Sequence, residues 1–144
     1  MAQTRTILVA EDNPDDAFLF RTAYTLGALE HTIHFVQDGE QVLQYLQGVP
    51  PFSDLKNFPE ADLLVLDLKM PLMDGFEVIK WIRSRPAYAE LPIVVFSGSN
   101  VAEDERRAIG LGANAYYVKP SLGAQLQLVV REICSAWFGH TEGA

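Results

Sequence analysis

Cysteine and long hydrophobic runs are what this chain has least of. Cys134 is the one cysteine in 144 residues, so an intramolecular disulfide and a cysteine-rich metal site are both excluded. The apolar run near the N-terminus is too short for a signal peptide, and no run approaches transmembrane length. We therefore expect a cytoplasmic protein that makes no membrane contact.

Basic residues are scarce as well. The sequence holds 11 Lys and Arg against 19 Asp and Glu, which gives a net charge of −8. Because binding to a nucleic-acid backbone needs clustered positive charge, we expect no nucleic-acid partner. The 49% share of hydrophobic residues is typical of a folded chain. The length fits a single domain over residues 1–144, with a core at about 5–138 and a short tail at 139–144.

Five short, continuous apolar runs are the main structural signal. Strands that are apolar on both faces favour a parallel sheet covered by helices, and the runs lie at 7–10, 33–36, 63–66, 93–96 and 115–118. A helical segment follows each run. This repeated βα order predicts an α/β, doubly wound, five-stranded parallel sheet of the flavodoxin-like (βα)5 type, with strand order 2-1-3-4-5. Ligands are expected at the carboxyl ends of the strands.

The helical segments begin and end at recognisable residues. Asn13 and Pro14 are typical of an N-cap and a first helical position, and the acids that follow, Asp15 and Asp16, suit the helix dipole. Further boundaries are predicted at Asp38, Gly48, Gly75 and Ser121. The segment after Asn100 offers few apolar anchors, so its helix should be loosely held.

The connection over residues 48–61 is longer than such joints usually are. Phe52, Leu55 and Phe58 give it apolar side chains to bury. Packing of this loop onto its own domain is the interpretation we favour. A surface for a partner or a dimer is the alternative.

Acidic residues follow two strands that are neighbours in this topology. Glu11 and Asp12 come after the first strand, and Asp67 comes after the third. Three converging carboxylates repel one another unless a cation lies among them. Oxygen ligands without His or Cys predict Mg²⁺, with Mn²⁺ as the alternative ion.

The remaining strand ends add a cation and a hydroxyl. Lys119 follows the fifth strand and Ser97 ends the fourth. The formal charges of the three carboxylates, the lysine and a divalent cation cancel, so the site can accept a dianionic phosphoryl group. An aspartate nucleophile would then form an aspartyl phosphate, with the metal and the lysine neutralising the transferred oxygens and Ser97 donating a hydrogen bond to one of them.

The order of these motifs resembles the response-regulator receiver domain of two-component signalling, over residues 7–138. The resemblance rests on the acidic pair, on DLKMPLMDG at 67–75, on the hydroxyl at 97 and on Lys-Pro at 119–120. It implies that Asp67 is the phosphoacceptor for a histidine kinase. It also implies that Lys119 binds the phosphoryl oxygens, and that the bond from Lys119 to Pro120 is cis.

The same resemblance implies a metal site and a switch. The backbone carbonyl of Lys69 would join Glu11, Asp12 and Asp67 around Mg²⁺. Ser97 would be the switch hydroxyl, and Tyr116 the aromatic ring that moves inward with it. From the residues alone, Ser97 could simply satisfy backbone groups at a strand end, and its functional role depends on the rest of the site. Tyr116 could instead be a core aromatic.

The resemblance further implies a phosphorylation-activated regulator without an output domain. It would catalyse its own phosphotransfer and dephosphorylation and would not be a stand-alone enzyme. The switch would reshape the face formed by the fourth helix, fifth strand and fifth helix, for a downstream protein, a phosphotransfer protein or a homodimer partner. The loop at 48–61, SGSN at 97–100 and Trp137-Phe138 resemble, more narrowly, the single-domain regulators that partner bacterial phytochrome kinases.

Two other functions compete with this interpretation. A haloacid-dehalogenase-type phosphatase also uses an aspartate at a strand end, but it needs a second acid two residues later, where this chain has Lys69. A degenerate receiver would bind partners without being phosphorylated. The complete set of Glu11, Asp12, Asp67 and Lys119 counts against it.

Overall fold

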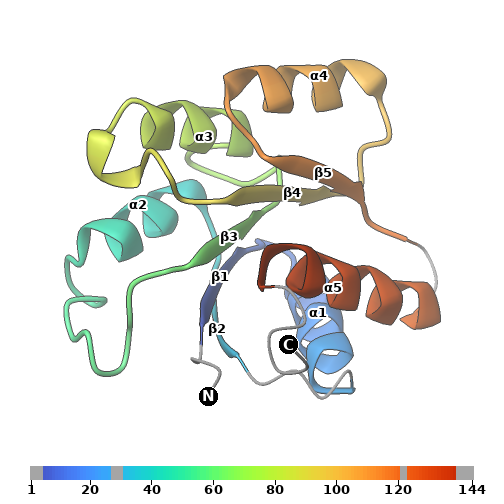
Figure 1. Ribbon diagram of the computed structural model, residues 1–144, viewed down its shortest axis with the longest axis horizontal. Coiled ribbons are helices and arrows are strands. Elements are labelled where there is room, and N and C mark those ends of the chain that lie inside the picture. The colour runs from blue at the N-terminus through green and yellow to red at the C-terminus, as the bar shows by residue number, and fades with distance from the viewer. Residues whose placement is uncertain (1–4, 27–30, 121–122, 139–144) are drawn as a thin grey trace.

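The computed structural model describes residues 5–26, 31–120 and 123–138 of the chain, as a regular alternation of strands and helices (Figure 1). The elements are, in order, β1 (Thr6–Ala10), α1 (Pro14–Leu26), β2 (Thr32–Val36), α2 (Gly39–Gln47), β3 (Leu63–Leu66), α3 (Gly75–Arg83), the 3₁₀ helix η1 (Pro86–Tyr88), β4 (Ile93–Ser97), α4 (Ala102–Leu111), β5 (Ala115–Val118) and α5 (Gly123–Phe138).

The strands form one parallel sheet in the order β2-β1-β3-β4-β5, which confirms the predicted topology. Every strand lies within one residue of its expected range. The register pairs Ala10 of β1 with Leu66 of β3, so the residues that follow them, Glu11 and Asp67, leave the sheet side by side. The order of the strands therefore places the two acidic motifs together.

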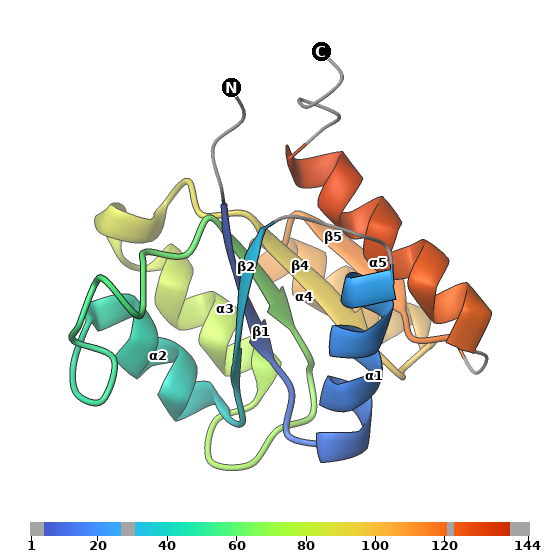
Figure 2. The same ribbon diagram turned by 90° about the horizontal axis from the view of Figure 1, so that it is seen from below.

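Helices cover both faces of the sheet, as Figures 1 and 2 show from two directions. Alternate residues of β1 point to opposite faces because the side-chain period of a strand is two. Leu8 belongs to the core beneath α2, α3 and α4, whereas Ile7 belongs to the core beneath α1 and α5. Both side chains are fully buried, which explains why the strand is apolar at every position.

The helix boundaries follow the predicted capping residues. Asp38 caps α2 by accepting a hydrogen bond from the Gln41 amide at 2.8 Å, and Gly48 ends that helix with a left-handed φ of 68°. Helix α3 begins at Gly75, as predicted, and Asp74, which was not predicted as a cap, closes a capping box with Glu77. The expected cap at Ser121 lies outside the described residues.

Helices α3 and α4 lie next to each other but are anchored very differently. Four residues of α3 are buried, whereas Ala108 is the buried residue of α4. Ile109 of α4 is 43% exposed. This sparse packing agrees with the expectation of a loosely held fourth helix. No helix in the described part of the chain is both long and apolar enough to cross a membrane.

The loop at 48–61 packs onto its own domain, as favoured from the sequence. Phe52 and Phe58 contact the ring of Tyr45, with centroid distances of 5.3 and 6.1 Å. The Tyr45 hydroxyl donates a hydrogen bond to the Pro59 carbonyl at 2.6 Å. Leu55 departs from the expectation: it is 63% exposed and lines a surface pocket together with Phe58.

Candidate functional site

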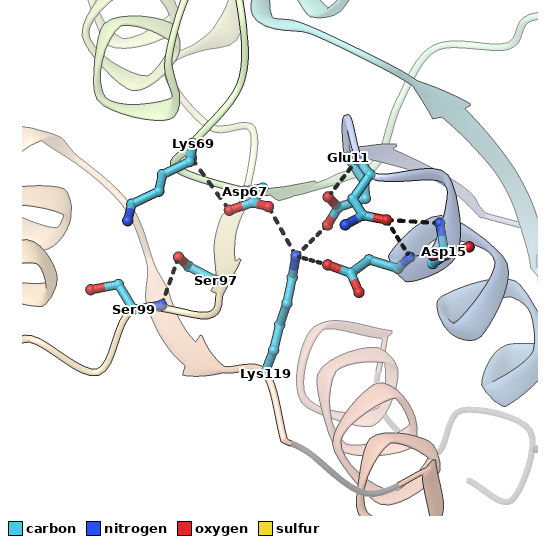
Figure 3. Close-up of polar contacts among 9 residues, drawn as sticks. Glu11, Asp15, Asp67, Lys69, Ser97, Ser99 and Lys119 are labelled. Atoms are coloured by element: carbon cyan, nitrogen blue, oxygen red, sulfur yellow. Dashed lines mark hydrogen bonds and ion pairs between the residues drawn. The ribbon is translucent and has the colours of Figure 1, made fainter.

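Charged side chains meet where β1, β3 and β5 end (Figure 3). The Asp67 amide donates a hydrogen bond to the Ala10 carbonyl at 3.1 Å, which continues the β1–β3 pairing up to the acid itself. Glu11 and Asp67 are only 7% and 8% exposed. Two carboxylates are therefore held close together with little access to water, and this arrangement requires a compensating positive charge.

A glycine allows the turn after Asp67 to pack tightly. A Cβ on Gly75 would lie 2.5 Å from the Asp67 carbonyl oxygen and 2.8 Å from the Leu68 Cα, so any side chain there would push α3 away from the turn. The Gly75 amide also donates to the Leu68 carbonyl at 2.8 Å. The start of α3 thereby fixes the backbone that carries the acid.

Glu11, Asp12 and Asp67 form the group of acids that could hold a metal ion. One carboxylate oxygen from each lies within 4.8 Å of the others. Asp12 is exposed, which leaves the group open to water on one side. An all-oxygen donor set with an open side fits a hard divalent cation that keeps several waters, as Mg²⁺ and Mn²⁺ do. When bound there, the ion would supply positive charge to transferring oxygens.

Lys69 lies immediately beside the group. Its amide donates to the Asp67 Oδ1 at 3.3 Å, and its side chain is exposed (Figure 3). The use of its backbone carbonyl as a metal ligand stays a prediction.

Lys119 supplies the compensating charge. Its Nζ lies 2.5 Å from Glu11 Oε1, 2.9 Å from Asp67 Oδ2 and 3.0 Å from Asp16 Oδ2. It reaches these oxygens without a cis bond to Pro120, so the expectation of a cis bond there is wrong. In the described residues, the cis bond joins Pro50 and Pro51.

Asp16 is the member of this arrangement that sequence reasoning missed, because it was assigned only to the helix dipole. Its place in the first turn of a helix that begins beside the acidic pair was the available signal. A cavity of about 40 Å³ borders Asp16, Glu11, Asp67 and Lys119 and is also lined by apolar residues such as Phe96.

The protonation of Glu11 and of Lys119 reflects this crowding. Burial raises the pKa of Glu11 to about 7; the negative charge of Asp67 adds to the rise, and the hydrogen bond from Lys119 opposes it. Burial alone would lower the pKa of Lys119. Its hydrogen bonds to Glu11 and Asp67, with the attraction of both charges, outweigh burial and raise that pKa above its ordinary value.

Ser97, the predicted switch hydroxyl, lies on the other side of Asp67 from Glu11 (Figure 3). Ser97 is 1% exposed, and its Oγ accepts a hydrogen bond from the Ser99 amide at 3.2 Å. The Lys119 amide donates to the Ser97 carbonyl at 2.7 Å. The hydroxyl and the lysine are therefore fixed to the same strand pair.

Ser99 connects this hydroxyl to α4 and β5. Its Oγ donates to Asp104 Oδ2 at 2.6 Å, and its carbonyl accepts a hydrogen bond from the Tyr116 hydroxyl at 2.9 Å. Tyr116 is half-buried, and it packs against the core beneath α2, α3 and α4. It thus has features of a core aromatic and a polar contact to the segment that follows Ser97.

A five-stranded parallel α/β fold with acids and a lysine at the carboxyl end of its sheet defines a class of site suited to phosphoryl transfer. The family model for the response regulator receiver domain matches residues 7–131. The chain belongs to this family, and it is a receiver domain of two-component signalling.

Several relatives are similar over most of the chain. The Rcp1 response regulator of Synechocystis sp. is 29% identical over 133 residues, which cover 92% of this chain and 88% of Rcp1. Its Mn²⁺-bound crystal structure superposes with a TM-score of 0.82 at 28% identity, covering 93% of this chain and 94% of that one. The phosphorylated cyanobacterial phytochrome response regulator RcpA has a TM-score of 0.85 at 30% identity, with 94% of each chain covered.

A further relative is far longer than this chain. The gliding motility regulatory protein of Myxococcus xanthus is 34% identical over 99 residues, which are 69% of this chain and 12% of that protein. The similarity thus concerns one domain of that relative.

Proposed function

We propose that Asp67 of this chain accepts a phosphoryl group from the phosphohistidine of a sensor histidine kinase. The observation that carries the proposal is the position of Asp67, whose two oxygens contact Lys119 Nζ and the Lys69 amide while Glu11 and Asp12 lie beside it. In the reaction, an Asp67 oxygen forms the new bond to phosphorus as the phosphorus–nitrogen bond breaks. The electron pair of that bond leaves with the imidazole.

The neighbouring residues have distinct roles in this proposal. Glu11, Asp12, Asp67 and the Lys69 carbonyl would hold Mg²⁺, or Mn²⁺. Lys119 neutralises developing negative charge on the phosphoryl oxygens, because its ammonium group already donates a hydrogen bond to Asp67 Oδ2. Ser97 donates its hydroxyl hydrogen to a phosphoryl oxygen, and this hydrogen is available because the Ser97 Oγ is the acceptor of its hydrogen bond with the Ser99 amide.

Movement of Ser97 would be transmitted through Ser99. Since Ser99 contacts Asp104 of α4 and Tyr116 of β5, a shift of this segment reshapes the face formed by α4, β5 and α5. The weak anchoring of α4 supports this route, because a two-state element must be cheap to move. That face would bind a downstream protein, a phosphotransfer protein or a second copy of the chain.

The similarity to the phytochrome response regulator RcpA supports a phytochrome-type histidine kinase as the phosphodonor. We place this reaction in the cytoplasm, as expected from the sequence. We further propose that the chain acts as one receiver domain and is not a stand-alone enzyme. A phosphatase of the aspartate-nucleophile type is disfavoured, since the residue two positions after Asp67 is the exposed Lys69.

Incubation with Mg²⁺ and phosphoramidate tests the phosphoacceptor directly. The expected product is an acid-stable, alkali-labile phosphoprotein, which Asp67→Asn does not form. Asp74→Asn is the matched control, because it makes the same chemical change in the same turn and asparagine also caps helices. Labelling of Asp67→Asn, or steady release of phosphate from varied phosphoesters, would refute the proposal.

A further inference from the structure

Lys119 has three ammonium hydrogens, and the structure gives each of them a carboxylate. Two of these carboxylates, Glu11 and Asp67, belong to the acid group that could hold a metal. The third, Asp16, does not belong to that group, and it lies 3.0 Å from Nζ. Asp16 is therefore the partner of Lys119 that metal binding leaves in place.

The geometry points to Asp16 as a positioning residue for Lys119 during phosphoryl transfer, an inference that rests on the proposed function. Once Asp67 carries a phosphoryl group, its carboxylate becomes an acyl phosphate with less negative charge on its own oxygens. Glu11 would at that stage face the metal. Asp16 then keeps the Lys119 ammonium group oriented toward the phosphoryl oxygens, because it still accepts a strong, charge-assisted hydrogen bond from that group.

The first turn of α1 holds Asp16 rigidly enough for this role. The Asn13 side chain accepts hydrogen bonds from the Asp15 and Asp16 amides at 2.8 and 3.3 Å, so the helix start is capped. One turn later, Phe20 is 2% exposed and meets Phe96 of β4 edge-to-face, at a centroid distance of 5.9 Å. The helix is thus fixed to the sheet beside the strand ends.

Burial further distinguishes Asp16 from its neighbour. The Asp16 side chain is 38% exposed and that of Lys119 is 15% exposed, so their ion pair is partly shielded from water. Asp15 is exposed, and the hydrogen bonds of Lys119 go to Glu11, Asp16 and Asp67. Asp15 therefore offers a control that removes the same charge from the same helical turn without removing a partner of Lys119.

The test follows phosphorylation of the full chain by phosphoramidate across a range of Mg²⁺ concentrations. This small donor needs no kinase docking, so the rate reports on the site alone. Asp16→Ala should lower the maximal rate about tenfold, the factor expected for one charge-assisted hydrogen bond, and leave the half-saturating Mg²⁺ concentration within about twofold. Asp15→Ala should match the unmodified chain. Asp16→Asn should recover part of the rate, because its amide oxygen can still accept from Lys119.

The outcomes separate this inference from the function on which it rests. If the unmodified chain is labelled and Asp16→Ala is as fast or faster, the positioning role is wrong and the phosphoacceptor stands. If the unmodified chain takes no label, both fail together. A maximal rate that falls equally in Asp16→Ala and Asp15→Ala would indicate a general charge effect and would also overturn the role. Thermal unfolding of each variant checks that the folded protein is being compared.

Discussion

The carboxyl end of the sheet and the loop at 48–61 differ in what their side chains bury: charged groups at the strand ends and aromatic rings beneath the loop. At the strand ends, Glu11 and Asp67 are buried beside each other, and the pKa of Glu11 rises to about 7 in consequence. Beneath the loop, Phe52 and Phe58 pack edge-to-face at a centroid distance of 5.3 Å. The buried carboxylates at the strand ends lower the stability of the fold but form the candidate reaction site, whereas the aromatic contacts beneath the loop raise its stability.

Substitutions in the two regions should therefore affect different properties of the protein. Changes at the strand ends should alter metal binding and phosphorylation, and some of them should leave the metal-free protein more stable. Changes beneath the loop should lower the free energy of unfolding and leave the chemistry of the folded fraction intact.

The pH dependence of Glu11 should give the largest effect. Its pKa is about 7 in the folded chain against an ordinary value of 4.5, so between these pH values the folded state keeps a proton that the unfolded state releases. The stability that this proton provides is present below about pH 4.5 and is lost as the pH rises through about 7. The loss should be about 3 kcal/mol at most.

Urea unfolding of the metal-free protein at several pH values measures this loss. Lys119 stays charged throughout the window because its pKa is raised, so it adds no slope of its own there. Glu11→Gln should flatten the dependence between pH 5 and about pH 7. A Glu11→Gln profile as steep as that of the unmodified chain would show that another group titrates.

Removal of the Phe58 ring should have the next largest effect. Phe58 contacts the rings of His34, Tyr45 and Phe52, so Phe58→Ala should lower the free energy of unfolding by about 2–3 kcal/mol. The phosphorylation rate of the folded fraction should stay within about twofold of the unmodified rate. The exposed Leu55 of the same loop is the control, and Leu55→Ala should change stability by less than about 0.5 kcal/mol. Equal effects of the two variants would contradict the account of this loop.

The smallest effect should come from Asp12. Asp12→Asn removes a negative charge beside Glu11 and Asp67, so it should raise metal-free stability by less than about 1 kcal/mol. It should also weaken Mn²⁺ binding, which the free-ion signal in electron paramagnetic resonance measures. Lower stability without metal would mean that Asp12 is not part of a repelling group.

How much the sequence predicted depends on whether local or tertiary contacts decided each feature. The strand at 63–66 was predicted to the residue because four consecutive aliphatic side chains can be buried on both faces only in a central parallel strand. Glu11, Asp67 and Lys119 could be grouped because the strand order alone brings their positions together.

Features that depend on packing could not be predicted in this way. The sequence could place Asp16 near the acidic pair, but its contact with Lys119 depends on how Phe20 packs α1 against the sheet. The exposure of Leu55 depends on which side chains of the loop pack against Tyr45, and Phe52 and Phe58 are the ones that do. The bond from Lys119 to Pro120 was wrongly predicted to be cis. That prediction came from the family resemblance and from no property of the two residues.

Trapping the acyl phosphate shows whether Asp67 is the residue that accepts the phosphoryl group. Borohydride reduces an aspartyl phosphate to homoserine, and peptide mass spectrometry then locates the modified position in the full chain. After phosphorylation by phosphoramidate with Mg²⁺, the account predicts homoserine at position 67. Homoserine at position 12 or 16, or no reduced residue in a chain that carries the label, would contradict it.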